Sequence, residues 1–169
     1  MSSATSSTST APLSDLPPIC RALFEAKAAS GLTFEQIGKA MGRGEVWVAS
    51  VFYGQAKPTP SDLKSLALAL QAYDPNSNID HASLMEQLGE NWYPVRGLGP
   101  MPPTDPVLYR LYEGLLVYGY PIKAIIHEKF GDGIMSMINC KVNVEKKPDP
   151  EGDRVVLTFD GKFLPYSKW

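Results

Sequence analysis

The chain has 169 residues, of which 44% are apolar, and a formal net charge of −2, so it can bury a core in one large domain or two small ones. The weak net charge and the lack of a Lys/Arg run exclude a nucleic-acid or anionic-membrane surface built on bulk electrostatics, and no apolar run is long enough to span a bilayer. Two cysteines, Cys20 and Cys140, and two histidines, His81 and His127, are too isolated in sequence to predict a zinc site.

Residues 1–16 are rich in Ser and Thr and contain no Lys or Arg. They lack the positive charge of a transit peptide and the apolar core of a signal peptide, so we predict a disordered tail. Because nothing indicates secretion, we interpret both cysteines as reduced thiols and expect a cytoplasmic protein.

Residues 17–94 carry apolar residues at helical spacing and predict a helical bundle. Thr33 and Gln36 form a capping-box pair that opens a short helix ending at Gly42, and a tight turn leads into a helix from Glu45 to Tyr53. A helix, a short Gly-containing turn and a second helix are the outline of a helix-turn-helix.

The second helix of this motif reads EVWVASVFY and offers no Arg, Asn, Gln or Lys to base edges. The surrounding region has more acidic than basic residues, whereas phosphate contacts need clustered positive charge. We therefore interpret the helix-turn-helix as a packing element and expect no nucleic-acid partner. A DNA-binding regulator without catalytic activity is the alternative function.

Residues 89–105 are dense in Gly and Pro and predict a connection between two domains, with a second domain over residues 95–169. Asp105 and Pro106 predict the start of a helix. We expect this helix to run to Tyr118 and to end at Gly119 and Pro121, with a short further helix over residues 122–130.

Alternating residues predict three short strands, at 137–144, 154–159 and 162–164, with a turn at PDPEGD and a hairpin turn at Asp160-Gly161. A sheet this small, with only short helices to cover it, makes a poor core and leaves edges that need pairing. We therefore expect this domain to be an obligate oligomer.

Arg110 and Glu113 are spaced i, i+3 on one face of the predicted central helix, and Ser136 stands just before a predicted strand. A guanidinium, a carboxylate and a hydroxyl suit recognition of a small planar anion. The residues alone equally allow an ordinary surface salt bridge beside a solvated serine. No phosphate-binding loop, dinucleotide fingerprint, GxSxG or HExxH motif is present.

The blocks YRLYE, IKAIIHEKFGDGIMS and DPEGDRVVLTFDGKFLPY resemble the cyanase (cyanate hydratase) family, and LTFEQIGKAMGRGEVWVASVFYGQ resembles its helical domain. The resemblance implies an α+β chain: an N-terminal helical bundle with a lambda-repressor-like helix-turn-helix, then a small α+β oligomerisation and catalytic domain. It implies decomposition of cyanate with bicarbonate, through carbamate, to ammonia and carbon dioxide, without metal or organic cofactor.

The resemblance also implies a homodecamer built from dimers, with sites assembled between subunits, and gives catalytic roles to Arg110, Glu113 and Ser136. Arg110, duplicated by subunit symmetry, would neutralise the two substrate anions and stabilise the dianionic adduct between them. Ser136 would orient a substrate oxygen. Glu113 would position Arg110, and a role in proton transfer stays open. An oligomeric scaffold without activity is a further alternative.

Overall fold

The computed structural model describes residues 15–77 and 79–169. It divides into two compact units between Leu98 and Gly99, which we call the helical unit (residues 15–98) and the hairpin unit (residues 99–169). The tail predicted over residues 1–16 lies outside the described residues except for its last two. Of these, Leu16 is buried in the core of the helical unit, so this unit includes at least one residue before the predicted start of the bundle at residue 17.

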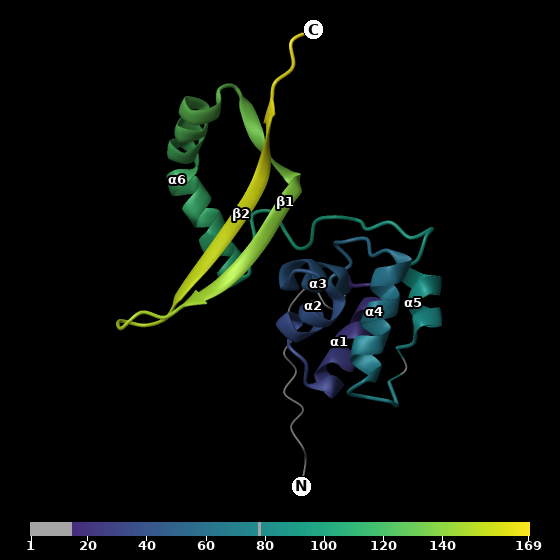
Figure 1. Ribbon diagram of the computed structural model, residues 1–169. Coiled ribbons are helices and arrows are strands. Elements are labelled where there is room, and N and C mark those ends of the chain that lie inside the picture. The colour runs from purple at the N-terminus through teal and green to yellow at the C-terminus, as the bar shows by residue number, and fades with distance from the viewer. Residues whose placement is uncertain (1–14, 78) are drawn as a thin grey trace. The chain divides into compact units, whose positions relative to one another are not determined.

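The helical unit has five helices within the described residues (Figure 1). They are α1 (Pro18–Ser30), α2 (Phe34–Met41), α3 (Glu45–Phe52), α4 (Pro60–Gln71) and α5 (His81–Leu88). The predicted capping box of α2 is confirmed: Thr33 Oγ1 accepts a hydrogen bond from Gln36 N at 3.1 Å, and Gln36 Oε1 accepts one from Thr33 N at 2.8 Å. These bonds satisfy two backbone donors at the start of the helix.

Apolar side chains from all five helices form one core. Aromatic rings pack at its edge, where the half-buried ring of Phe24 meets Phe34, Phe52 and Tyr53 edge to face at centroid distances of 4.9–6.3 Å. The largest fully buried side chains are Phe52, Leu23, Ile37, Leu63, Leu66, Leu70, Leu84, Leu88, Val48, Val51 and Cys20.

A buried carboxylate joins the helix-turn-helix to α4. Asp62, with 5% of its side chain exposed, accepts hydrogen bonds from Arg43 Nε at 2.8 Å and from the backbone N–H and hydroxyl of Thr59. Burial acts to raise the pKa of Asp62, but the bonds from Thr59 and Arg43 together lower it below its usual value. The carboxylate therefore stays charged and paired.

Two side chains hold the start of the connection against the helical unit. Lys57 Nζ donates to the carbonyl oxygens of Glu90 at 2.7 Å and Trp92 at 2.5 Å. Gln55 Nε2 donates to the carbonyl oxygen of Val95 at 3.1 Å. The backbone carbonyls after α5 thus find donors within the unit, which keeps this irregular segment in one path.

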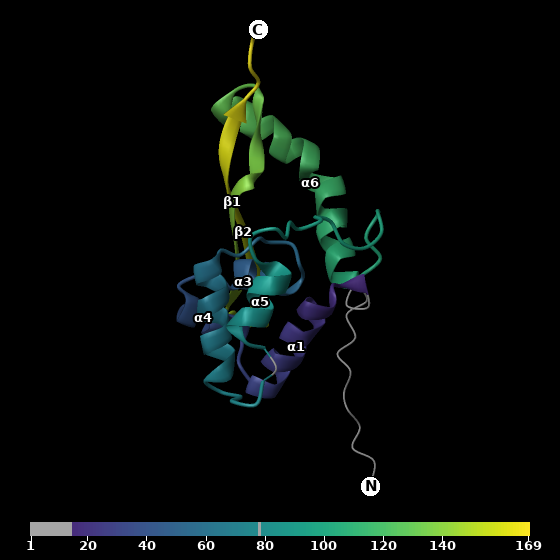
Figure 2. The same cartoon turned by 90° about the vertical axis from the view of Figure 1, so that its right-hand side faces the viewer.

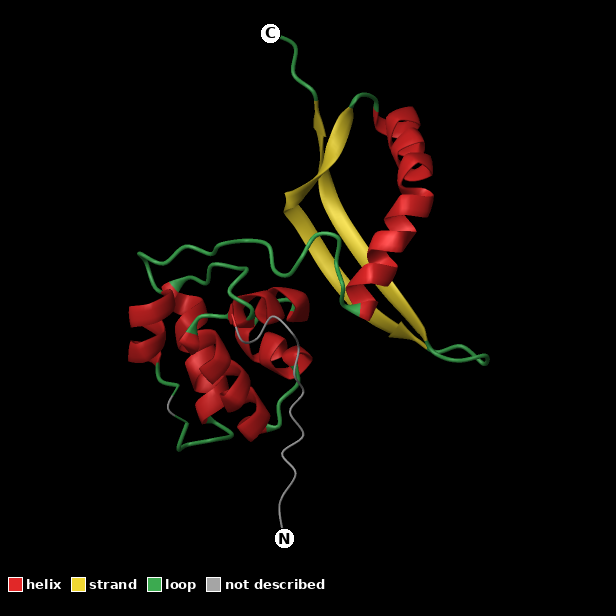
Figure 3. Cartoon of the chain, turned by 180° about the vertical axis from the view of Figure 1, so that it is seen from behind, coloured by secondary structure: helices red, strands yellow, loops and turns green. Residues whose placement is uncertain are grey.

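The hairpin unit consists of α6 (Pro106–Phe130), β1 (Gly133–Lys147) and β2 (Arg154–Pro165) (Figures 1 and 2). The two strands pair antiparallel, and the chain returns from the end of α6 into β1. One unit is entirely helical and the other joins a helix to a hairpin, so the predicted α+β class is confirmed (Figure 3).

The prediction that the central helix ends near Tyr118 is wrong, because α6 continues through Gly119 and Pro121 as one 25-residue helix. Proline lacks the N–H that would bond the carbonyl oxygen of Val117, four residues earlier. Val117 is 59% exposed within this chain, so this part of the helix is not buried. The cost of an internal proline is smaller at such a site than in a buried helix.

The hairpin unit has two long strands where the sequence predicted three short ones. Asp160 and Gly161 pair with Lys141 and Cys140 inside the β2 ladder, so the predicted hairpin turn at these residues is wrong. The chain reverses instead between β1 and β2, over residues 148–153, where the PDPEGD turn was predicted.

Residues 99–169 are all described, and only Gly133 and Ser136 among them are buried. No side chain of α6 is buried within the chain. Large apolar residues along α6 stand exposed, including Val107, Leu111, Leu115, Leu116 and Ile125. The unit therefore has no hydrophobic core of its own.

Candidate active site

Asp105 fixes the start of α6 and so places Arg110 and Glu113. Its Oδ1 atom accepts hydrogen bonds from the backbone N–H groups of Val107 at 2.9 Å and Leu108 at 3.1 Å, as an N-cap does. Arg110 Nη1 then meets Glu113 Oε2 at 2.5 Å across one turn. The predicted pairing of these two side chains is present.

The Arg110 side chain is 75% exposed and Glu113 is 47% exposed. The hydrogen bond that Arg110 donates to the Glu113 carboxylate raises the pKa of the guanidinium, so the group is always cationic. Only one guanidinium nitrogen bonds to Glu113, and the side chain is largely exposed. This geometry leaves donors for an anion.

Ser136 lies inside β1 rather than before a strand, and 5% of it is exposed, so the alternative of a solvated serine is wrong. Its Oγ atom accepts hydrogen bonds from the backbone N–H groups of Ile138 at 3.2 Å and Asn139 at 2.9 Å. A hydroxyl has two acceptor lone pairs and one proton. With both lone pairs occupied, Ser136 keeps its O–H to donate.

Sequence reasoning missed these two backbone amides as hydrogen-bond partners of Ser136. A serine that accepts from amides two and three residues later is a local turn motif, and such motifs compete with strand pairing. The signal in the sequence was Ser136 itself, which stands three residues before Asn139 and directly before residues 137–144, a run that was interpreted as an uninterrupted strand. The motif explains why regular pairing stops at this point.

One chain does not bring Ser136 to the other two residues. Within the described residues, no hydrogen bond or ion pair links Ser136 to Arg110 or Glu113. Arg110 lies 130 − 110 = 20 residues before the end of α6, about 30 Å along the helix at 1.5 Å per residue. The six residues from there to Ser136 reach back at most about 20 Å, so the two Cα atoms stay about 10 Å or more apart.

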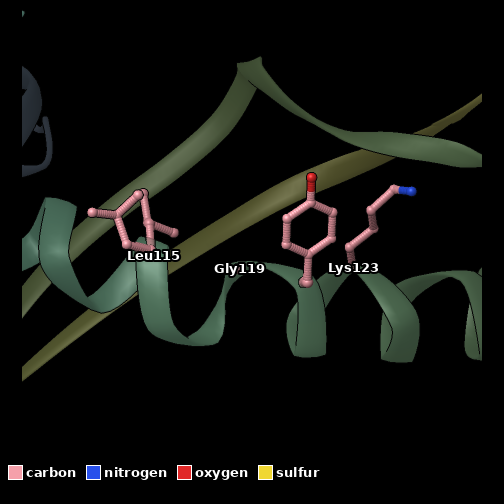
Figure 4. A pocket seen from close by; sticks show the side chains of 5 residues that line it. Leu115, Gly119 and Lys123 are labelled. Atoms are coloured by element: carbon pink, nitrogen blue, oxygen red, sulfur yellow. The ribbon is translucent and has the colours of Figure 1, made fainter.

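A shallow hollow of about 200 Å³ lies on α6 beyond the Arg110–Glu113 pair. Its lining is mostly apolar and consists of Leu115, Leu116, Gly119, Tyr120 and Lys123. The side chains of Leu115 and Lys123 stand on either side of Gly119, whose missing side chain opens the hollow (Figure 4). None of the three predicted site residues lines it.

The second helix of the helix-turn-helix packs into the bundle through Val48, Val51 and Phe52. Its other residues are half-buried, and Ser50 Oγ donates to the carbonyl oxygen of Val46 at 2.8 Å. Arg43, in the preceding turn, is paired with Asp62. Nothing in this part of the described chain supports the alternative of a DNA-binding regulator.

Residues 15–77 and 79–169 contain no group of three or more His, Cys, Asp or Glu side chains placed to hold a metal ion. They also contain no helix both long and apolar enough to cross a membrane.

The fold is that of a two-part α+β protein, and the three predicted site residues are divided between a helix and a strand. Residues 100–168 match the family model of the cyanate lyase C-terminal domain. A cyanate hydratase of Coprinopsis cinerea is 66% identical over 152 residues, which cover 90% of this chain and 96% of that protein. The chain belongs to the cyanate lyase family.

Two further comparisons extend the likeness. A cyanate hydratase of Trichormus variabilis is 49% identical over 154 residues, which cover 91% of this chain and 99% of that protein. The crystal structure of cyanase from T. urticae matches with a TM-score of 0.72 and 37% identity, over 87% of this chain and 96% of that chain. The likeness thus includes both units and confirms the predicted family.

Proposed function

We propose that this chain decomposes cyanate together with bicarbonate, forming carbamate, which breaks down to ammonia and carbon dioxide. The observation that carries the proposal is the exposed Arg110 guanidinium, held by Glu113 within the block that matches the cyanate lyase C-terminal domain. The names of the relatives, cyanate hydratases and a cyanase, supply the substrate.

The chemistry must overcome repulsion between two anions. Two unit negative charges about 4 Å apart repel by about 1 kcal/mol in bulk water and about 4 kcal/mol at a partly desolvated site. Arg110 offsets this charge, and its fork of donors holds the reactants near each other. The benefit grows when a bicarbonate oxygen attacks the cyanate carbon, because the adduct carries both charges on one molecule.

The bonds and protons of the reaction balance without an oxidant or reductant. The adduct loses carbon dioxide from its bicarbonate half and leaves carbamate, and protonated carbamate splits into ammonia and a second carbon dioxide. One cyanate, one bicarbonate and two protons thus give one ammonia and two carbon dioxide. No metal or organic cofactor enters this scheme, and Glu113 positions Arg110 while remaining a candidate for one proton transfer.

Ser136 supplies a neutral donor to an oxygen or nitrogen of the bound anions. Since one chain leaves Ser136 away from Arg110, we infer that a complete site needs residues of more than one copy. The exposed apolar residues Val107, Leu111, Leu115, Leu116 and Ile125 form what we call the apolar stripe of α6. Burial of this surface between copies would remove it from water and so favour their association. The family resemblance suggests a homodecamer built from dimers.

We place the reaction in the cytoplasm. Cys20 and Cys140 are both free thiols, and burial raises the pKa of Cys20 to about 11, which keeps that thiol protonated and unreactive. Unpaired cysteines fit a reducing compartment.

The test is ammonia release by the purified full chain, measured with and without bicarbonate in degassed buffer. We expect turnover that requires bicarbonate and yields two carbon dioxide per ammonia, of which ¹³C-cyanate labels one and ¹³C-bicarbonate the other. The Arg110→Ala variant is the control for contaminating activity. Turnover independent of bicarbonate would contradict the two-anion scheme, and no turnover at all would contradict the proposed function.

A further inference from the structure

The pairing between β1 and β2 is interrupted at one place, where β1 carries extra residues. Pairing stops after Met135↔Phe163 and resumes at Cys140↔Gly161. Four residues of β1, 136–139, therefore lie opposite a single residue of β2, Lys162. Such an insertion is a large β-bulge, a feature that redirects side chains and is common next to active sites. Ser136 is the first residue of this bulge.

Gly161 is the residue of β2 against which the bulge closes. A Cβ atom at position 161 would lie 2.5 Å from the carbonyl oxygen of Ser136 and 2.5 Å from Met135 Cγ. Neither distance is compatible with non-bonded contact between heavy atoms, whose optimal separation is about 3.5–4.0 Å. Gly161 is thus required for space, because every larger residue carries a Cβ at that point.

The two sides of this contact differ in how they are held. β2 is paired with β1 on both sides of Lys162, from Arg154 to Gly161 and from Phe163 to Pro165. The bulge has no such ladder, and Ile138 at its centre is 99% exposed. A side chain at position 161 would therefore displace the bulge and leave the ladder in place.

We propose that Gly161 is a positioning residue for Ser136: its missing side chain lets the bulge close, and the closed bulge fixes the Ser136 hydroxyl in place with its O–H free to donate. The closed form is marked by the two bonds that Ser136 Oγ accepts from Ile138 N and Asn139 N. This inference rests on the proposed function, in which Ser136 donates to the bound anions. Gly161 touches no reacting atom and acts only through Ser136.

The experiment is a double-mutant cycle on the assembled full chain, with Gly161→Ala and Ser136→Ala made singly and together. We expect Ser136→Ala to lower kcat/KM on the order of a hundredfold, the loss typical of one preorganised donor. Gly161→Ala should lower it by about tenfold or more with the sedimentation coefficient unchanged. In the Ser136→Ala background, Gly161→Ala should cost less than about twofold, because its target is gone.

Two companion variants sharpen the cycle. Gly44→Ala is the matched control, because Gly44 has a φ of −65° and an added Cβ meets nothing within 4 Å; activity should stay at the wild-type level. Adding Met135→Ala to Gly161→Ala removes the side-chain clash and leaves the clash with the Ser136 carbonyl. We expect no rescue, and full rescue would place the effect in Met135 packing and overturn the proposal.

Hydrogen exchange gives a readout that does not need turnover. The peptide containing Ile138 and Asn139 should exchange faster in both Gly161→Ala and Ser136→Ala than in the wild type and in Gly44→Ala. Any one of three outcomes overturns the proposal. Hydrogen exchange could be unchanged in Gly161→Ala, the variant could lose its assembly, or Gly161→Ala could cost as much activity in the Ser136→Ala background as in the wild type. If the wild type is inactive but the exchange pattern is as expected, the proposed function is wrong and the bulge has no catalytic role. The structural effect of Gly161 on the bulge would still hold.

Discussion

In the helical unit, apolar side chains of five helices meet in one buried core, whereas in the hairpin unit not one apolar side chain is buried. The difference does not come from composition, since α6 is rich in Leu, Ile, Val and Tyr. It comes from how much apolar surface each unit can bury by itself. Five short helices pack around a common core, while one helix and a two-stranded ribbon leave most of their surface exposed.

The comparison explains why the candidate residues lie where they do. The helical unit can fold on its own contacts, so its polar residues serve caps and one buried ion pair. We proposed above that the hairpin unit gains its burial from other copies of the chain, and two of its candidate residues, Arg110 and Glu113, lie on the exposed helix that those copies would cover. Assembly and catalysis should therefore depend on the same contacts.

The largest expected effect comes from a charge on the apolar stripe of the hairpin unit. Leu115→Asp should abolish both assembly and turnover, since a buried unpaired carboxylate is costly at an interface. Sedimentation and ammonia release measure the two outcomes. Leu68→Asp is the matched control on the helical unit, because Leu68 is 60% exposed and Leu115 is 63% exposed. An assembled, active Leu115→Asp enzyme would refute the link between this stripe and the site.

Next in size is the loss of geometry at Arg110. Arg110→Lys keeps the charge but removes the planar fork, so kcat/KM should fall on the order of a hundredfold. The melting temperature and the sedimentation coefficient should stay near their wild-type values, because the pair with Glu113 is solvent-exposed. If activity is lost only together with assembly, Arg110 is an interface residue and its catalytic role is wrong.

Local signals in the sequence predicted much of the fold. Thr33 with Gln36 predicted the start of α2, and the spacing of Arg110 and Glu113 predicted their pairing. In both cases the two partners lie within one helical turn, so a short stretch of sequence contains both groups that form the contact. The family blocks added the activity, which these contacts alone could not identify.

The errors arose where the sequence signal was local and the outcome was not. Asp160-Gly161 has the composition of a hairpin turn, but its state is decided by pairing with Cys140 and Lys141, about 20 residues away in the chain. Gly161 also lies against the carbonyl oxygen of Ser136, 161 − 136 = 25 residues earlier, which no local pattern indicates. Pro121 was interpreted as a helix end because its local penalty was visible, whereas the helix continues through it.

A smaller effect is expected from a cavity in the helical unit. Leu66→Ala removes a fully buried side chain and should lower the free energy of unfolding by about 2–5 kcal/mol. Urea denaturation followed by circular dichroism measures it. Leu116→Ala, where the side chain is 65% exposed within the chain, should leave the stability of the helical unit unchanged. Equal losses in that unit would show that the two units do not fold independently.

The smallest expected effect separates buried from exposed carboxylates within the helical unit. Asp62→Asn should lower the free energy of unfolding by about 1–3 kcal/mol at pH 7, because Arg43 and Thr59 lose a charged partner. Asp80→Asn is the control, since Asp80 is an exposed N-cap of α5 and Asn caps equally well.

The pH dependence distinguishes a charge effect from a change of shape at Asp62. Because the folded pKa of Asp62 is lowered, its contribution is complete above the unfolded value of about 3.9 and is lost as the pH falls through the folded value. The gap between wild type and Asp62→Asn should therefore be constant from pH 7 to about pH 5 and should narrow below about pH 4. Urea titrations at each pH measure this gap. A gap that persists unchanged at pH 3 would assign the loss to packing and would show that the ion pair with Arg43 contributes nothing by charge.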